Sequence, residues 1–318
     1  MNEFELIRTY FADFPVDASV VEGIGDDAAV LQPPQDQLLV QTTDTLIAGV
    51  HFPVDASAAD IAHKALMVNL SDIAAMAATP LWFTLSITLP EVDEPWLHAF
   101  AERLQSLCKD LGLNLIGGDT TRGPLAISIT VTGAVEPEKY VLREGAQVAD
   151  EIYVSNTIGD AALGLALWQG NDKTGVDGAI ATERFHRPQA RLDIGQALGG
   201  IATSMLDCSD GLFDDLQHIL TRSGVGAEIN VNDIPVSAAV SAYCESMENL
   251  LALLNGGDDY ELVFTAATAQ RDEIAARTKN LSCSVQRIGK IVAGNDLLLR
   301  DKNGKTLDLE TRGYKHFV

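Results

Sequence analysis

The sequence predicts an α/β or mixed α+β protein built from two α/β domains. Apolar residues recur at helical spacing in some segments and alternate as in β-strands in others. The two kinds of segment follow one another through both halves of the chain, which is typical of this fold class. The chain has 318 residues, of which 47% are hydrophobic, enough to bury a large core. This length favours two domains over one large domain.

Most elements of the first half can be placed from spacing and capping residues. Phe4, Ile7 and Phe11 recur at helical spacing, and Ser57 and Asp93 are residue types that cap helix N-termini. We expect Pro80 and Gly112 to end the two long helices. The predicted helices are 3–14, 57–78 and 93–112, and the predicted strands are 28–31, 38–42, 82–89, 113–116 and 125–135.

A polar, turn-rich segment at 136–150 predicts the boundary between the domains, which we place between residues 147 and 148. The expected domains are therefore 1–147 and 148–318. The second domain again mixes helices and strands, with a loop at 171–178. Its predicted helices are 161–169, 188–198, 212–221 and 270–279, and its predicted strands are 152–155, 227–231, 261–266 and 285–291.

Composition excludes several classes of partner. Forty-five acidic residues against 22 basic ones give a formal net charge of −23, so we expect no nucleic acid and no anionic membrane surface as a partner. The four cysteines form no CxxC pair and have no disulfide-type spacing. They predict reduced thiols in a cytoplasmic protein. We expect neither a secretory signal nor a membrane span.

Acidic residues gather at glycine-rich turns and expected strand ends, starting with Asp26 and Asp27 in Gly23-Ile24-Gly25-Asp26-Asp27. Such acids repel one another unless a cation lies between them. A single acid in a turn is more often a helix cap or turn-former, but the recurrence favours a divalent cation. The hydroxyl groups of Thr42, Thr43 and Ser209 lie beside these acids in the sequence, and hard oxygen ligands of this kind suit Mg²⁺. The further acids of this pattern are Asp44, Asp72 (inside an apolar helix, where the alternative is a solvent-facing position), Asp119, Asp207, Asp210, Asp258 and Asp259.

Other motifs are weaker. Residues 23–28 match G-x-G-x-x-A, but the expected strand follows the glycines rather than preceding them, which argues against a dinucleotide fold. No P-loop motif occurs. The histidines lack metal-ligand spacing, and His51 is a plausible substrate contact. Arg143 is either a phosphate clamp or the partner of Glu144 or Glu138 in a surface ion pair.

These motifs, taken in order, resemble those of the thiamine-monophosphate kinase family, in the aminoimidazole-ribonucleotide-synthetase-like superfamily. The resemblance runs nearly end to end, and the set is far more specific than any one motif. It is carried by 25–28 (Gly-Asp-Asp-Ala), 42–44 (Thr-Thr-Asp) with His51, 69–76 (Asn-Leu-Ser-Asp-Ile-Ala-Ala-Met), 117–122 (Gly-Gly-Asp-Thr-Thr-Arg), 209–211 (Ser-Asp-Gly), 256–261 (Gly-Gly-Asp-Asp-Tyr-Glu) and 313–314 (Gly-Tyr).

The resemblance implies a homodimer that forms through a shared barrel-like sheet of the first domain. It also implies transfer of the γ-phosphate of ATP to thiamine monophosphate, assisted by several Mg²⁺ ions. One position departs from the family pattern, because Asp258 stands where the family has glutamate. By resemblance the metal ligands are Asp27, Thr42, Thr43, Asp44, Asp72, Asp119, Asp207 and Asp210; the nucleotide contacts are Gly118, Asp119, Arg143 and Ser209; and the substrate contacts are His51, Asp258 and Tyr314.

No catalytic residue distinct from the metal ligands is expected, because a phosphate acceptor is already a nucleophile at neutral pH. Charge cancellation and in-line alignment are then the main requirements. Two other functions remain open from the sequence. One is an ATP-dependent ligase or cyclase of the same superfamily that acts on a phosphorylated ribose, and the other is a non-catalytic divalent-cation-binding protein.

Overall fold

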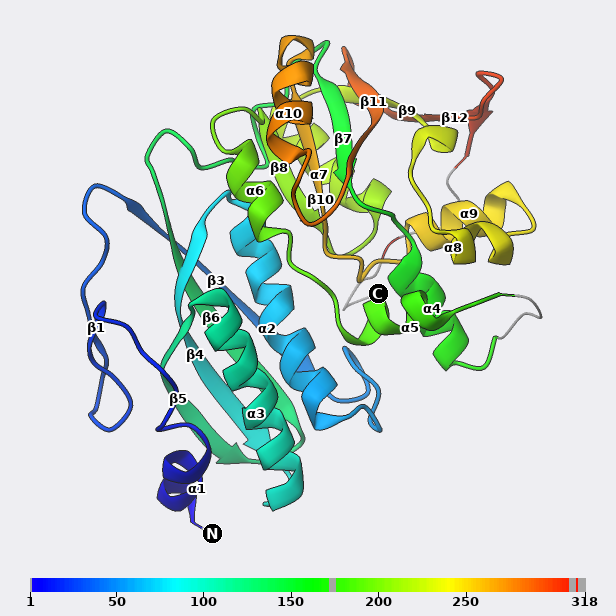
Figure 1. The fold of residues 1–318 in the computed structure, drawn as a ribbon. Helices are drawn as coiled ribbons and strands as arrows, with labels where there is room; N and C mark the ends of the chain where they lie inside the picture. The colour runs from blue at the N-terminus through cyan, green and yellow to red at the C-terminus, as the bar shows by residue number, and fades with distance from the viewer. Residues whose placement is uncertain (1, 172–175, 309–312, 314–318) are drawn as a thin grey trace. The chain divides into compact units, whose positions relative to one another are not determined.

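The computed structural model describes residues 2–171, 176–308 and 313. The chain divides into two compact units (Figure 1). Unit 1 comprises residues 1–73 and 78–137, and unit 2 comprises residues 74–77 and 138–318. Both units contain a β-sheet with helices, so the predicted mixed α/β fold class is confirmed.

Unit 1 is built on a four-stranded sheet of order β3-β6-β4-β5. Strands β3, β6 and β4 are antiparallel neighbours, and β5 joins β4 in parallel through a helical crossover. Because β3 and β5 are the edge strands, residues on them are separated by the full width of the sheet. The bounds are β3 Leu38–Ile47, β4 Thr79–Leu89, β5 Asn114–Arg122, β6 Ala126–Val135, α2 Ala58–Ala75 and α3 Glu94–Leu111, with α1 Glu3–Tyr10 and a ribbon of β1 Val20–Glu22 and β2 Val30–Leu31 preceding them.

The two faces of this sheet differ in chemistry. On β4, Phe83, Leu85 and Ile87 are buried, whereas the alternate residues Thr84, Ser86 and Thr88 are half-buried or exposed. Helices α2 and α3 cover the apolar face (Figure 1). The other face carries a layer of hydroxyls in which Thr45 and Ser128 lie 2.7 Å apart and Thr88 and Thr121 lie 2.9 Å apart.

Helix α2 ends in a way that the sequence did not predict. Ala77 adopts a φ of +56°, and the N–H groups of Ala77 and Ala78 donate to the carbonyls of Ala74 and Ile73. This is the hydrogen-bond pattern of a Schellman motif, which normally uses glycine. The expectation that Pro80 ends the helix was wrong, since Pro80 is the second residue of β4, where an early strand position tolerates proline.

Unit 2 holds a seven-stranded sheet of order β13-β12-β9-β11-β7-β10-β8. The bounds are β7 Glu151–Ser155, β8 Ser204–Cys208, β9 Gly226–Asn230, β10 Glu261–Ala266, β11 Val285–Val292, β12 Leu297–Arg300 and β13 Thr306–Leu307. The helices are α4 Asp160–Trp168, α5 Ala179–His186, α6 Leu192–Leu198, α7 Leu212–Ser223, α8 Ala238–Tyr243, α9 Met247–Leu254 and α10 Arg271–Thr278, with short 3₁₀ turns at Val231–Asp233 and Thr268–Gln270.

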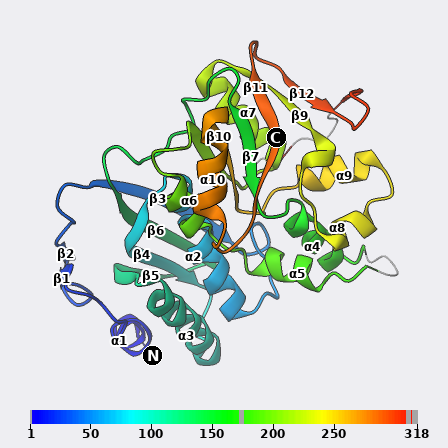
Figure 2. The same ribbon diagram turned by 45° about the horizontal axis from the view of Figure 1, so that its top comes forward.

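Strands β7, β8 and β10 are buried on both faces. One face packs on α7, where Leu206 and Val263 meet Leu216. The other packs on α6 and α10, which lie beside each other (Figure 2) and contribute Ile194 and Ile274. Residues at the ends of β8 and β10 are therefore held by a core on either side.

The structure also corrects several expected bounds. Strand β3 continues to Ile47 and β5 to Arg122, so Asp44 and Asp119 lie within strands rather than at strand ends. The sequence did not predict β1, β8, β12, β13, α5, α8 or α9. The expected loop at 171–178 falls partly outside the described residues. No described helix is long and apolar enough to cross a membrane.

Candidate functional site

In unit 1, strand β3 and helix α2 bring four of the conspicuous polar residues together. Asn69 on α2 is fully buried. Its Oδ1 accepts a hydrogen bond from the backbone N–H of Asp44 at 2.9 Å, and its Nδ2 donates to the carbonyl of Ala65 at 3.0 Å. The Thr42 hydroxyl donates to Oδ2 of Asp72, three residues further along α2. These bonds fix Asp44 and Asp72 on facing elements.

The two carboxylates interact unfavourably when both are charged. Burial raises the pKa of Asp44 to about 6, and the charge of Asp72 contributes in the same direction. A cation between them would relieve this repulsion. The donor set of two carboxylates and the Thr42 hydroxyl consists of hard oxygen atoms, and Mg²⁺ uses one or two carboxylates together with water and phosphate oxygens. The residues present therefore fit Mg²⁺.

Asp119 is not part of this group within one chain. In the sheet register it aligns with Ser86, Ser128 and Thr45, so its side chain lies on the hydroxyl-bearing face. Asp44 lies on the α2 face of the opposite edge strand, three inter-strand spacings or about 14 Å away. Within residues 2–171, 176–308 and 313, no group of three or more histidine, cysteine or acidic side chains is arranged to hold a metal ion.

The other predicted residues of unit 1 are dispersed. Thr43 is on the hydroxyl-bearing face, and its hydroxyl donates to the carbonyl of Ile129 at 3.1 Å. Asp27 is exposed in the β1–β2 connection. At Gly118 a Cβ atom would lie 1.8 Å from the Leu85 carbonyl oxygen, so only glycine fits there. Nδ1 of His51 accepts from the N–H of Ile47 at 3.0 Å, which leaves the proton of a neutral ring on Nε2.

In unit 2, the loop after β8 is organised around a carboxylate that sequence reasoning missed. Backbone N–H groups of Ser209, Asp210 and Gly211 all donate to Oδ2 of Asp215 at 3.0 Å. Asp215 is in the first turn of α7, and burial raises its pKa to about 7. Asp207 precedes the loop on β8 and is buried. Asp215 therefore sets the backbone path of the predicted nucleotide contact Ser209 and the predicted metal ligand Asp210.

The segment Gly257–Tyr260 packs directly on this loop. The N–H of Asp258 donates to the carbonyl of Ser209, and the N–H of Tyr260 donates to the carbonyl of Cys208, both at 2.8 Å. A Cβ atom at Gly257 would lie 2.6 Å from the Ser209 carbonyl oxygen. The structure thus brings the predicted substrate contact Asp258 beside the predicted nucleotide contact Ser209.

Two further buried acids support this segment. Asp259 accepts hydrogen bonds from the N–H groups of Gly159 and Ala161, at 2.7 and 3.1 Å. The Glu261 carboxylate accepts hydrogen bonds from Nε and Nη2 of Arg191 and from the Ser155 hydroxyl. Sequence reasoning assigned neither a supporting role. The signal available in the sequence was the group of acids that follows the Gly256-Gly257 pair.

Of the two remaining predicted residues of unit 2, the structure describes Arg143 but not Tyr314. Arg143 is exposed, and in the described part of the chain it forms neither the ion pair with Glu144 nor that with Glu138. Glu144 pairs instead with Arg222, at 3.5 Å. Tyr314 lies outside the described residues. The preceding Gly313 donates its N–H to Asp214 at 2.9 Å, and its Cα approaches the Asp210 carbonyl so closely that a Cβ would lie 2.4 Å from that oxygen.

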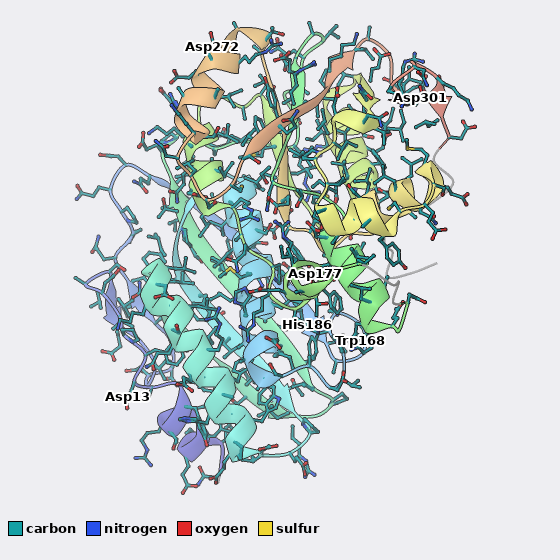
Figure 3. The ribbon with its side chains drawn as sticks, turned by 45° about the vertical axis from the view of Figure 1, so that its right-hand side comes forward. Asp13, Trp168, Asp177, His186, Asp272 and Asp301 are labelled. Carbon is teal, nitrogen blue, oxygen red and sulfur yellow. The ribbon has the colours of Figure 1, made fainter. Side chains whose placement is uncertain are left out.

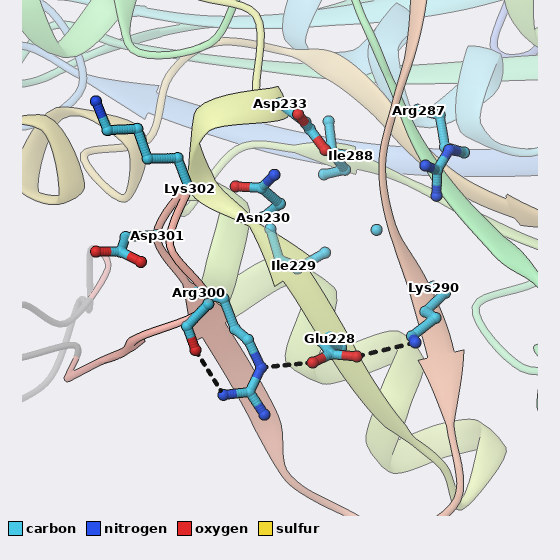
Figure 4. Close-up of a pocket in the computed structure, with 12 residues that line it drawn as sticks. Glu228, Ile229, Asn230, Asp233, Arg287, Ile288, Lys290, Arg300, Asp301 and Lys302 are labelled. Carbon is cyan, nitrogen blue, oxygen red and sulfur yellow. Dashed lines mark hydrogen bonds and ion pairs between the residues drawn. The ribbon is translucent and has the colours of Figure 1, made fainter.

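A surface hollow of about 360 Å³ in unit 2 contains none of the predicted site residues (Figure 4). It lies over β9, β11 and β12, on the side of the sheet order away from β8. Glu228 in its floor bonds to both Arg300 and Lys290. These cross-strand ion pairs involve three of the seven charged residues that line the hollow. Elsewhere exposed acids such as Asp13, Asp177 and Asp272 are spread over the surface (Figure 3).

Comparisons with known proteins agree with the motifs and the fold. The model of the AIR synthase related protein N-terminal domain matches residues 25–135, and that of the C-terminal domain matches residues 147–302. The chain therefore belongs to the AIR synthase related family. Three curated relatives, 42–43% identical over 98% of their own length, are thiamine-monophosphate kinases, and the chain is an enzyme of this group.

The individual similarities extend over nearly the whole chain. Thiamine-monophosphate kinase of Salmonella typhimurium is 43% identical, covering 100% of this chain and 98% of that protein. The solved thiamine-monophosphate kinase from Stenotrophomonas maltophilia K279a is 41% identical with a TM-score of 0.85, covering 95% of this chain and 96% of that one. AaThiL complexed with AMPPCP and TMP is 29% identical with a TM-score of 0.77, covering 99% of this chain and 95% of that one.

Proposed function

We propose that this chain transfers the γ-phosphate of ATP directly to the phosphate of thiamine monophosphate, giving thiamine diphosphate and ADP. The names of its full-length relatives support the substrates, as does the neighbour solved with AMPPCP and TMP. The observation in this chain that carries the proposal is the Asp44 and Asp72 pair. Two carboxylates held on facing elements, one with its pKa raised by burial and by the other, make a site that needs a cation.

The proposed magnesium ligands fall into two sets. Asp44, Asp72 and Thr42 would hold a cation in unit 1. Asp27, Thr43 and Asp119 are further proposed ligands of this unit, although within one chain they do not lie with that group. Asp207 and Asp210 would do so in unit 2. When bound, Mg²⁺ neutralises phosphate oxygens and lets two anionic substrates approach each other. The fixed backbone of these residues supplies the alignment.

The rest of the site is proposed to bind and orient. Gly118, Asp119, Arg143 and Ser209 contact the nucleotide, and His51, Asp258 and Tyr314 contact the vitamin monophosphate. His51 can donate from Nε2. No side chain is assigned as nucleophile: burial raises the pKa of the Cys208 thiol, the cysteine nearest the loop, well above its usual value. A phosphate acceptor needs no base to remove a hydroxyl proton.

The proposal includes a homodimer that forms through the first domain. The exposed hydroxyl-bearing face of the β3-β6-β4-β5 sheet, with Leu38, Leu39 and Ile47 exposed on edge strand β3, is the surface we assign to it. We assign nucleotide and metal binding with dimerisation to residues 1–147 and completion of the substrate site to 148–318. The four cysteines, all free, support a reducing compartment, and we propose the cytoplasm.

A coupled assay of ADP release from Mg-ATP, run with a panel of acceptors, tests the function. Thiamine monophosphate is expected to be the preferred acceptor, and thiamine a poor one. Turnover with a phosphorylated ribonucleotide but not with thiamine monophosphate would instead indicate a ligase or cyclase. Tight Mg²⁺ binding without ATP turnover on any acceptor would indicate a cation-binding protein.

A further inference from the structure

The segment Gly257–Tyr260 holds a left-handed backbone conformation that is unusual for the aromatic residue at its end. The φ angles of Gly257, Asp258 and Tyr260 are +80°, +67° and +52°. Glycine adopts this left-handed region readily and aspartate tolerates it, but an aromatic residue is rare there. Such strain persists only where the surroundings enforce it, and it gathers at functional sites.

The surroundings do enforce it, from two sides. The N–H groups of Asp258 and Tyr260 are bonded to the carbonyls of Ser209 and Cys208. Between them, the buried Asp259 carboxylate accepts the N–H groups of Gly159 and Ala161. The backbone therefore has little freedom to relax at any of these three residues.

One consequence of this path is that the side chains of residues 258 and 260 meet. The Tyr260 hydroxyl donates to Oδ1 of Asp258 at 3.0 Å, and both side chains are half-buried. The terminal rotation of an aspartate side chain is otherwise broad. This hydrogen bond restrains that rotation, and a carboxylate, with about four lone-pair positions, can accept from more than one donor at once.

We infer that Tyr260 is a positioning residue for the substrate site: its hydroxyl orients the Asp258 carboxylate toward the amine-bearing pyrimidine of the vitamin monophosphate. This inference rests on the proposed function and assigns a role to a residue outside the predicted site. It also offers a reason why the shorter aspartate can serve at a position where the family pattern has glutamate. An acceptor oriented before binding loses less freedom when the substrate arrives.

The test is a double-mutant cycle with steady-state kinetics on the full-length protein. The variants are Tyr260→Phe, Asp258→Ala and the double variant. Tyr260→Phe keeps the ring and the strained backbone and removes only the hydroxyl. Its KM for thiamine monophosphate should rise by about fivefold, the typical net effect of losing one hydrogen bond. The kcat and the KM for ATP should change by less than about twofold.

In the Asp258→Ala background the same substitution should have no further effect on KM, because Tyr260 then has no carboxylate to orient. A matched control is Tyr153→Phe, since Tyr153 in β7 also donates its hydroxyl to a carboxylate, that of Glu151. That variant should leave the KM for thiamine monophosphate unchanged. KM is a property of the folded molecules, so it remains measurable if a variant is partly unfolded.

Three results are decisive. An unchanged KM in Tyr260→Phe, with the wild type active, would overturn the inference and leave the proposed function intact. Additive effects of the two substitutions would also overturn it, by showing that Tyr260 contacts the substrate on its own. A wild-type protein that does not phosphorylate thiamine monophosphate at all would overturn the proposed function, and the inference with it.

Discussion

The hydroxyl of Thr42 on β3 donates a hydrogen bond to Oδ2 of Asp72 on α2, across the junction between sheet and helix. This bond, with the bond from Asp44 N–H to Asn69, holds Asp44 and Asp72 in fixed positions although their charges repel. A protein tolerates such a pair when its function requires it. Removing either charge should therefore harm turnover far more than folding.

We expect Asp44→Asn or Asp72→Asn to lower kcat by on the order of a hundredfold, as loss of a principal electrostatic stabiliser does. Each amide keeps an oxygen, so the side chain introduced by Asp72→Asn could still accept from Thr42, and the melting temperature without metal should be unchanged or higher. Steady-state kinetics with thermal melts in EDTA check both points. Asp110→Asn, an exposed position on α3, is the control. Near-normal kcat at saturating Mg²⁺ would show that these carboxylates are not the metal site.

Metal and nucleotide should stabilise the protein by mass action. Melting temperatures are expected to rise from EDTA to Mg²⁺ and again on adding AMPPCP with Mg²⁺. In Asp44→Asn the increments should be smaller, because a ligand of the proposed cation has lost its charge. Differential scanning fluorimetry at several Mg²⁺ concentrations measures this. Identical melting curves under all three conditions would contradict a metal-dependent nucleotide site.

The loop that carries Ser209 and Asp210 should depend on an acceptor oxygen at residue 215 more than on its charge. Asp215→Ala leaves three backbone N–H groups without their acceptor and should lower the free energy of unfolding by about 3 kcal/mol. Asp215→Asn retains an oxygen and should lose only about 1 kcal/mol. Urea denaturation of both variants checks this order. Equal losses in the two variants would mean that the charge is what matters.

Stability should depend on pH through Asp259. Burial raises the pKa of this carboxyl to about 7, so the folded state binds its proton more tightly than the unfolded state. The contribution is fully present below the ordinary aspartate pKa near 4 and is lost as pH rises to about 7, a change of a few kcal/mol. Urea denaturation of wild type and Asp259→Asn at pH 5, 6, 7 and 8 measures it. The wild type should lose stability relative to the variant up to pH 7 and then level off, whereas a wild type that gains stability relative to the variant as pH rises would contradict the sign.

Much of the fold could be predicted because its signals are local. Asp93 caps α3 by accepting from the N–H of Trp96, and Gly112 ends that helix with a φ of +63°, as expected from the residue types. Strand β10 at Glu261–Ala266 has the predicted bounds. By contrast, β8 is a five-residue strand buried on both faces, and its sequence Ser-Met-Leu-Asp-Cys shows no alternation. Burial on two faces removes the pattern that identifies a strand.

The sequence predicted the proposed metal ligands of the candidate site but not the residues that hold them in place. Asp44 stands out as an acid at an expected strand end and Asp72 as an acid inside an apolar helix, and the structure does bring them together. Asp215 looked like an ordinary acid in the first turn of a helix, a position that the helix dipole favours anyway. Its three N–H partners become visible only when the loop is folded around it. The distance of Asp119 from Asp44 was likewise unpredictable, since it depends on strand order.

The measurement that tests direct transfer most closely is a rapid-quench experiment with γ-labelled ATP, Mg²⁺ and thiamine monophosphate, run in parallel with thiamine as the acceptor. The label is expected to pass straight into thiamine diphosphate in a single turnover, with none bound to protein, and this transfer should be about a hundredfold slower in Asp44→Asn. Label trapped on the protein before product forms, or label entering thiamine as fast as its monophosphate, would contradict direct transfer between two phosphates.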